Sequence, residues 1–144
     1  MTEDALAQLA GIDLRVSKGP YALGSWKTES ASEILKKLST LELDMALAIV
    51  DEKEVSCLVP QKILPELPPP VMLEEDWAIV TLDQEMDWGM VGVLAAVSTA
   101  LARAKIPLGA FSAYSRDHLL VKQDQLDPSM KVLKEICGET RFED

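Results

Sequence analysis

The chain has 144 residues, of which 48% are hydrophobic and 26% are charged, and its formal net charge is −10. This composition predicts a folded protein with one domain, or two very small ones, and it excludes nucleic acid and anionic membranes as partners, since both require clustered Lys and Arg. The N-terminal stretch MTEDALAQLAG does not resemble a secretory signal, and Cys57 and Cys137 fit no zinc or disulfide pattern. We therefore expect a cytoplasmic protein with reduced thiols, without a metal or cofactor.

The first half of the chain alternates short apolar runs with one helical pattern. Strands are predicted at 14–16 and 21–26, on either side of a Lys-Gly-Pro turn. Apolar residues at helical spacing over 34–41 predict a helix. Two further apolar runs, 45–50 and 55–59, flank the charged link Asp-Glu-Lys-Glu and predict a hairpin.

Prolines dominate the segment between the two halves, with five of them between residues 60 and 70. Proline donates no amide hydrogen bond and has a fixed φ angle, so this segment is predicted to be an extended connector. We expect an N-terminal subdomain over 1–60, a Pro-rich connector over 61–74 and a C-terminal domain over 75–144.

The second half repeats the order of elements. A strand is predicted at 77–82 and a helix at 89–104, followed by a hairpin of strands at 108–114 and 118–121. A last helix begins at Asp127-Pro128, and the tail after Gly138 is expected to be frayed. Two such βαββ units predict an α+β, ferredoxin-like fold with antiparallel sheets and helices on one face. The uncovered face favours a homodimer or another protein partner.

Motifs of the second half resemble the ACT domains of the CASTOR type, which are small amino-acid-sensing modules. The motifs that carry the resemblance are Gly92-Val93-Leu94, Lys105-Ile106-Pro107, Ser112-Ala113-Tyr114 and Asp117-His118-Leu119-Leu120-Val121. The resemblance covers residues 75–126 and is faint before residue 54. Ala113 departs from the family, which usually has Thr there. The resemblance implies two tandem ACT subdomains that bind a free amino acid at a subdomain or dimer interface, without catalysis, as in the regulatory part of aspartate kinases.

The residues themselves suit a zwitterionic ligand. Helix-opening amides and their dipole favour a carboxylate, and glycine lets the ligand approach the backbone. These amides are predicted at Gly89, Met90, Val91 and Gly92. Asp117, at the hairpin bend, offers an acceptor for the ammonium group, and the resemblance adds Ala113 and Tyr114 beside it. Asp83, Glu85 and Asp87 add negative potential for a cationic side chain, and Trp88 is a candidate pocket wall.

Structural roles compete with each of these assignments. Asp117 can be a turn residue that accepts amides of its own loop, and the acidic loop residues can simply be solvated. His118 is expected to be half exposed and structural, and no nucleophile motif, P-loop or dinucleotide fingerprint is present. The rival to an amino-acid-binding regulator is therefore a ligand-free interaction scaffold of the same fold, which the alanine at position 113 favours.

Overall fold

The computed structural model describes residues 3–85 and 87–143, and residues 1, 2, 86 and 144 lie outside this description. Contacts divide the chain into two compact units. Unit 1 comprises Met1–Lys18 and Ala78–Asp144, and unit 2 comprises Gly19–Trp77. Unit 2 is therefore inserted, in sequence, between the two parts of unit 1.

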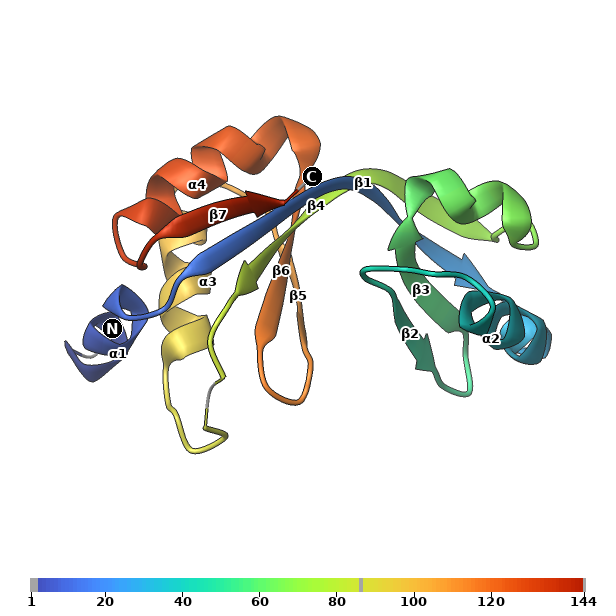
Figure 1. The fold of residues 1–144 in the computed structure, drawn as a ribbon, viewed down its shortest axis with the longest axis horizontal. Coiled ribbons are helices and arrows are strands. Elements are labelled where there is room, and N and C mark those ends of the chain that lie inside the picture. Colours follow the sequence, from blue (N-terminus) through green and yellow to red (C-terminus); the bar gives the residue numbers. More distant parts are fainter. Residues whose placement is uncertain (1–2, 86, 144) are drawn as a thin grey trace. The chain divides into compact units, whose positions relative to one another are not determined.

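Two long strands, β1 (Leu14–Trp26) and β4 (Met72–Leu82), each begin in one unit and end in the other (Figure 1). The amide of Asp83 donates to the carbonyl of Asp13 (2.8 Å), and the amide of Val71 donates to that of Ser25 (2.7 Å). The strands therefore run antiparallel. Both are longer than predicted, and for this reason the predicted boundaries at residues 60 and 75 do not coincide with the edges of the two units.

Unit 2 has the strand order β2-β3-β1-β4. Its other elements are the 3-10 helix η1 (Thr28–Ser30), α2 (Ala31–Ser39), β2 (Leu47–Val50), β3 (Val55–Pro60) and the 3-10 helix η2 (Gln61–Glu66). The predicted hairpin is confirmed, because β3 pairs antiparallel with β2 and also with β1. The core of this unit consists of Trp26, Ile34, Val55, Cys57, Val59, Ile63 and Leu67.

The Pro-rich segment is not the extended connector that we predicted. Its first part forms η2, and Ile63 of this helix is buried in the core of unit 2. The indole Nε1 of Trp26 donates to the carbonyl of Pro68 (2.7 Å), which fixes the segment beyond the helix. A proline-rich stretch can pack in this way because short 3-10 turns tolerate proline and need few amide donors.

Unit 1 has the strand order β7-β1-β4-β6-β5. Its other elements are α1 (Glu3–Ala10), α3 (Val93–Arg103), β5 (Gly109–Ser112), β6 (Asp117–Lys122), the 3-10 helix η3 (Gln123–Gln125), α4 (Leu126–Lys134) and β7 (Thr140–Glu143). The hairpin of β5 and β6 is antiparallel, as predicted. The α+β class and the repeated βαββ order are confirmed.

The helices of unit 1 cover one face of its sheet. Alternate strand residues, such as Val16, Val80 and Leu119, share one core with Val97 of α3 and Leu133 of α4. Alternation places their neighbours on the other face. These neighbours include Arg15, Thr81, His118 and, through its register with Arg15, Arg141.

The C-terminal tail is a strand, where a frayed segment was predicted. β7 pairs in parallel with the start of β1, from Leu14 opposite Thr140 to Ser17 opposite Glu143. The amide of Glu139 donates to the Asp13 carboxylate (2.9 Å), which anchors the entry into the strand. The prediction failed because a strand of mixed polarity takes its hydrogen bonds from a partner more than a hundred residues away.

Candidate functional site

A pocket of about 220 Å³ lies in unit 1 between the loop that precedes α3, the first turn of α3 and the β5–β6 turn. In Figure 1 the loop leading into α3 and the β5–β6 turn lie at the lower edge of this unit. The pocket is lined by Asp87, Trp88, Met90, Gly92, Val93, Leu94, Ala95, Ser112, Ala113, Tyr114, Ser115, Arg116 and Asp117.

The helix α3 begins at Val93, four residues later than predicted. Gly92 precedes it with φ of 90°, a left-handed conformation that glycine adopts without steric strain. The first helical hydrogen bond runs from the Ala96 amide to the Gly92 carbonyl (2.9 Å). The helix-opening amides are therefore those of residues 93–95, all of which line the pocket, and not those of residues 89–92.

The β5–β6 turn presents Asp117 to the pocket. The amide of Ala113 donates to the carbonyl of Arg116 (2.9 Å), which closes the turn. The Ser112 hydroxyl donates to Asp117 Oδ1 (2.5 Å), so this carboxylate does stabilise its own hairpin, as the structural reading expected. Its Oδ2 atom makes no hydrogen bond to any residue that the structure describes, and remains available to a ligand.

The loop before α3 supplies the aromatic side of the pocket. The Gly89 amide donates to Asp87 Oδ1 (2.6 Å), which turns one oxygen of this carboxylate toward its own loop. Trp88 is 70% exposed and Tyr114 is 85% exposed, and their rings meet edge to face with centroids 6.2 Å apart. Two large rings thus stand at the pocket with most of their surface in water.

The structure brings most of the predicted site residues together. Those that line the pocket are Asp87, Met90, Gly92, Ala113, Tyr114 and Asp117. Gly89 and Val91 are not among the lining residues, and Val91 is 82% exposed. They were chosen because the helix was expected to start at residue 89. Whether any of these residues binds a ligand stays a prediction.

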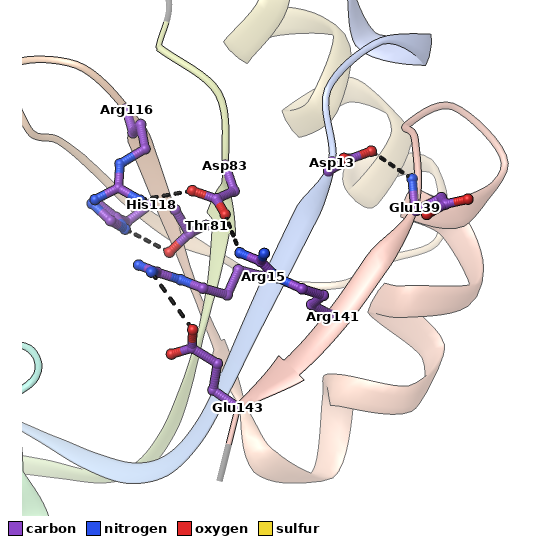
Figure 2. Close-up of polar contacts among 9 residues, drawn as sticks. All are labelled: Asp13, Arg15, Thr81, Asp83, Arg116, His118, Glu139, Arg141 and Glu143. Atoms are coloured by element: carbon purple, nitrogen blue, oxygen red, sulfur yellow. Dashed lines mark hydrogen bonds and ion pairs between the residues drawn. The ribbon is translucent and has the colours of Figure 1, made fainter.

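Arg116 was missed by the sequence analysis although it lies in the predicted bend. It lines the pocket, and its guanidinium Nη1 lies 2.7 Å from Asp83 Oδ1. The other oxygen of Asp83 is bound by Arg141 Nη2 of β7 at 2.6 Å (Figure 2). The only local signal was an arginine in a polar hairpin bend, since its partner belongs to a neighbouring strand.

Asp83 is neither a solvated acid nor a source of free negative potential. The hydrogen bond from Arg116 is the main cause that lowers the pKa of Asp83 below its ordinary value of 3.8, against the opposing effect of burial. The charges of Arg15, Arg116 and Arg141 lower this pKa further. Both readings that the sequence allowed for Asp83 are therefore wrong, because its charge is balanced by arginines.

His118 lies beside this cluster and is only 3% exposed, where a half-exposed side chain was expected. Its Nδ1 atom is 2.8 Å from the hydroxyl of Thr81, and its ring stacks on Phe111 at 4.9 Å (Figure 2 shows the Thr81 contact). Burial is the main cause that lowers the pKa of His118, with the charge of Arg116 adding to it. The histidine is thus a neutral, packed residue on the helix-free face of the sheet.

The described residues show no arrangement for metal chemistry or thiol chemistry. Burial raises the pKa of Cys57 and that of Cys137 to about 11, so that both thiols are protonated at neutral pH. No group of three or more metal-ligating side chains is found in the described part of the chain. In the same residues, none of the helices has the length and apolar character needed to cross a bilayer.

A comparison with known protein families gives a match for part of the chain. Residues 72–135 match the family model of the ACT domain. This match agrees with the resemblance predicted over 75–126, and it does not distinguish the CASTOR type. It contains the loop, the first turn of α3 and the hairpin bend that form the pocket. The comparison with curated proteins gives no match.

Solved structures show the same fold at low sequence identity. A protein from Agobacterium tumefaciens matches with a TM-score of 0.74 at 17% identity, over 93% of this chain and 95% of its own. Aspartokinase α and β subunits match with a TM-score of 0.67 at 15% identity, over 88% and 98%. The ligand-free regulatory subunit of aspartate kinase from Thermus thermophilus matches with a TM-score of 0.63 at 12% identity, over 85% and 95%. The predicted tandem ACT, ferredoxin-like fold is therefore confirmed.

Proposed function

We propose that this chain is a non-catalytic regulatory module of the ACT type, related to the CASTOR type, that binds a free amino acid in the pocket of unit 1. The proposal depends on one observation: groups that favour a negative charge and a group that favours a positive charge line the same pocket. The residues whose amides open α3 and Asp117 line the same pocket. The regulatory role is supported by the fold shared with aspartate kinase regulatory subunits.

A zwitterion suits these two groups for simple electrostatic reasons. The α-carboxylate of an amino acid accepts hydrogen bonds from the amides of residues 93–95, where the helix dipole favours negative charge. The α-ammonium group donates to the Oδ2 atom of Asp117. Gly92, with its left-handed φ of 90°, lets α3 begin directly behind it, so that these amides belong to residues that line the pocket.

The proposal extends to a homodimer in the cytoplasm. Apolar side chains gather at the pocket with much of their surface exposed, and large exposed apolar patches commonly mark interfaces. Trp88 and Tyr114 of the pocket lining are largely exposed, and so is Val91 of the loop beside them. In addition, β5 lies at the end of the strand order, so its outer edge has no partner strand among the described residues. Sedimentation equilibrium with and without ligand tests this part, and a mass of one chain in both conditions contradicts it.

Isothermal titration of the full chain against each standard amino acid tests the main proposal. We expect at least one to bind with micromolar to millimolar affinity, and Asp117→Asn to weaken that binding about 10- to 100-fold, since a hydrogen bond to a charged group contributes about 1.5–3 kcal/mol. Asp124→Asn, an exposed acid away from the pocket, is the matched control and should bind as the unchanged chain does.

The rival function is a ligand-free interaction scaffold. It is favoured by Ala113, which lines the pocket without the hydroxyl that the resemblance leads one to expect. Under this alternative no amino acid at millimolar concentration gives heat or shifts the melting temperature, and Asp117→Asn leaves partner binding unchanged. The titration therefore decides between the two functions.

A further inference from the structure

We propose that the pocket selects amino acids with a large apolar side chain, such as leucine or phenylalanine, over those with charged or very small side chains. This inference rests on the proposed amino-acid-binding function and adds the class of ligand. The inference depends on the residues that line the pocket besides the α3 amides and Asp117, which are proposed to bind the carboxylate and ammonium groups of the ligand.

Part of the pocket lining is apolar. It is formed by Trp88 and Met90 from the loop, Val93 and Leu94 from α3, and Tyr114 from the hairpin bend. The two aromatic rings touch each other only edge to face, and most of their surface remains in water. An apolar side chain packed against their exposed surfaces removes this area from water, which is favourable in proportion to the area buried.

The acidic residues near the pocket offer little to a cationic side chain of a ligand. The sequence had suggested Asp83, Glu85 and Asp87 as partners for a cationic side chain. In the structure Asp83 is bound by two arginines, Glu85 is not among the lining residues, and Asp87 turns one oxygen to the Gly89 amide. The second oxygen of Asp87 is the carboxylate oxygen left for a cationic side chain, and because Asp87 is exposed, an ion pair there should contribute little to binding.

An anionic side chain lacks a counter-ion for a similar reason. Arg116 is the basic residue of the pocket lining, and its guanidinium is committed to Asp83 at 2.7 Å. A ligand carboxylate bound at the remaining N–H groups of Arg116 would share one positive charge with the Asp83 carboxylate and would be repelled by it. Since two carboxylates would then depend on one arginine, aspartate and glutamate are disfavoured as ligands.

The size of the pocket limits the ligand to a single amino acid. Its volume of about 220 Å³ is below the roughly 300–1,000 Å³ typical of sites for drug-sized ligands. A single amino acid is therefore a better match to this volume than a nucleotide or a longer peptide. Because one methylene group in an apolar pocket changes affinity by about 10-fold or more, leucine should bind at least tenfold more tightly than alanine.

A titration panel on the unaltered full chain tests the inference, with leucine, phenylalanine, alanine, lysine and aspartate as probes. We expect leucine or phenylalanine to bind at least tenfold more tightly than each of the other three. Lysine, aspartate or alanine binding as tightly as leucine overturns this inference and leaves the proposed function standing. If none of the standard amino acids binds, both are overturned.

Variants of the two exposed rings test which residues set the preference. Trp88→Ser and Tyr114→Ser should each weaken leucine and phenylalanine binding about tenfold and leave the weaker binding of alanine unchanged, because alanine reaches neither ring. Phe142→Ser replaces another half-exposed aromatic residue that does not line the pocket, and serves as the control. Equal losses for leucine and alanine overturn the inference, since they indicate a general defect of the pocket. Circular dichroism checks that each variant is folded.

Discussion

Arg116 joins the pocket to the helix-free face of the sheet in unit 1. Its carbonyl closes the β5–β6 turn at the pocket, and its guanidinium binds Asp83 beyond the end of β4. Asp83 also binds Arg141 of β7. One carboxylate therefore connects three segments that are far apart in sequence, and any movement of the hairpin bend on ligand binding must carry this connection with it or break it.

Replacing Asp83 by asparagine should destabilise the protein by about 1–2 kcal/mol, because two charged hydrogen bonds are lost while the contribution of Arg141 is reduced by its 70% exposure. Urea unfolding of the variant and the unchanged chain measures this difference. Glu135→Gln, an exposed acid without such contacts, is the control and should change stability by less than about 0.5 kcal/mol. Equal stability of the two variants would show that the arginine cluster contributes nothing.

Because of His118, we expect the folded protein to lose stability in mild acid. Burial lowers its pKa in the folded protein, so between the ordinary value of 6.5 and that lower pKa the unfolded chain binds a proton and the folded chain does not. Stability should therefore fall as pH decreases below about 6.5. In the folded protein, the charges of Arg15 and Arg116 oppose protonation of His118, and those of Asp83 and Asp117 favour it.

This pH dependence is assigned to one group, since His118 is the only histidine in the chain. Urea unfolding at a series of pH values from neutral to about 5 measures it. His118→Asn should flatten the profile in this range. Asp83 does not interfere, because its lowered pKa confines its own loss of stability to pH below about 3.9. A variant that retains the full slope would contradict the prediction.

At the scale of elements, the start of α3 fixes the pocket. Gly92 turns the chain with φ of 90° so that the helix can begin directly behind it. A Cβ atom added at this position would also meet the side chain of Ala5 in α1 at 3.4 Å. The conformation of one residue thus sets where the helix-opening amides lie relative to the hairpin bend.

Gly92→Ala should lower stability by about 1–2 kcal/mol, the usual cost of a left-handed conformation with a side chain. It should also weaken ligand binding, because the first turn of α3 shifts. Thermal or urea unfolding measures the first effect and titration the second. Gly11→Ala is the matched control, since Gly11 has no left-handed φ and its added Cβ would meet only the Gln8 carbonyl, at 3.6 Å. An unchanged or slightly higher stability is expected for it.

Elements with a strong local pattern could be predicted from the sequence. The hairpin of β2 and β3 and that of β5 and β6 followed from apolar runs around polar links, because alternation and turn residues are local properties. The helix α3 could be predicted for the same reason. Part of the pocket could be predicted for this reason, since its residues Gly92, Tyr114 and Asp117 lie at the ends of these elements.

Features set by distant partners could not be predicted. The strand β7 depends on its pairing with β1, and the charge balance of Asp83 depends on Arg116 and Arg141. The exact start of α3 depends on a left-handed glycine next to another helix. In each case the deciding interaction joins residues that no short window of sequence contains.

At the scale of the whole molecule, unit 1 is assembled from two separate parts of the chain. Leu9, Leu14 and Val16 of the first part belong to the same core as residues of α3, β6 and α4 from the second. The first part also supplies the strand between β4 and β7. A fragment that begins at residue 75 lacks this strand and part of the core.

We therefore expect a fragment of residues 75–144 not to fold cooperatively, because β7 loses its partner and the core is opened. Residues 1–18 joined to residues 78–144 by a short glycine-rich turn should fold, since β1 and β4 run antiparallel between the Asp13–Asp83 and Ser25–Val71 hydrogen bonds. Thermal melts and amide hydrogen exchange compare the two. A sharp melt of the 75–144 fragment alone would support the predicted domain division at residue 75.

The insertion of unit 2 within unit 1 has a consequence for biosynthesis. Ribosomes make proteins from the N-terminus, so residues 19–77 emerge complete while the second part of unit 1 is still missing. At about 5–20 residues per second, the rest of the chain takes roughly 3–13 s to appear. During that time the apolar residues of the first part, such as Leu9 and Leu14, lack the core partners that α3, β6 and α4 supply in the folded unit.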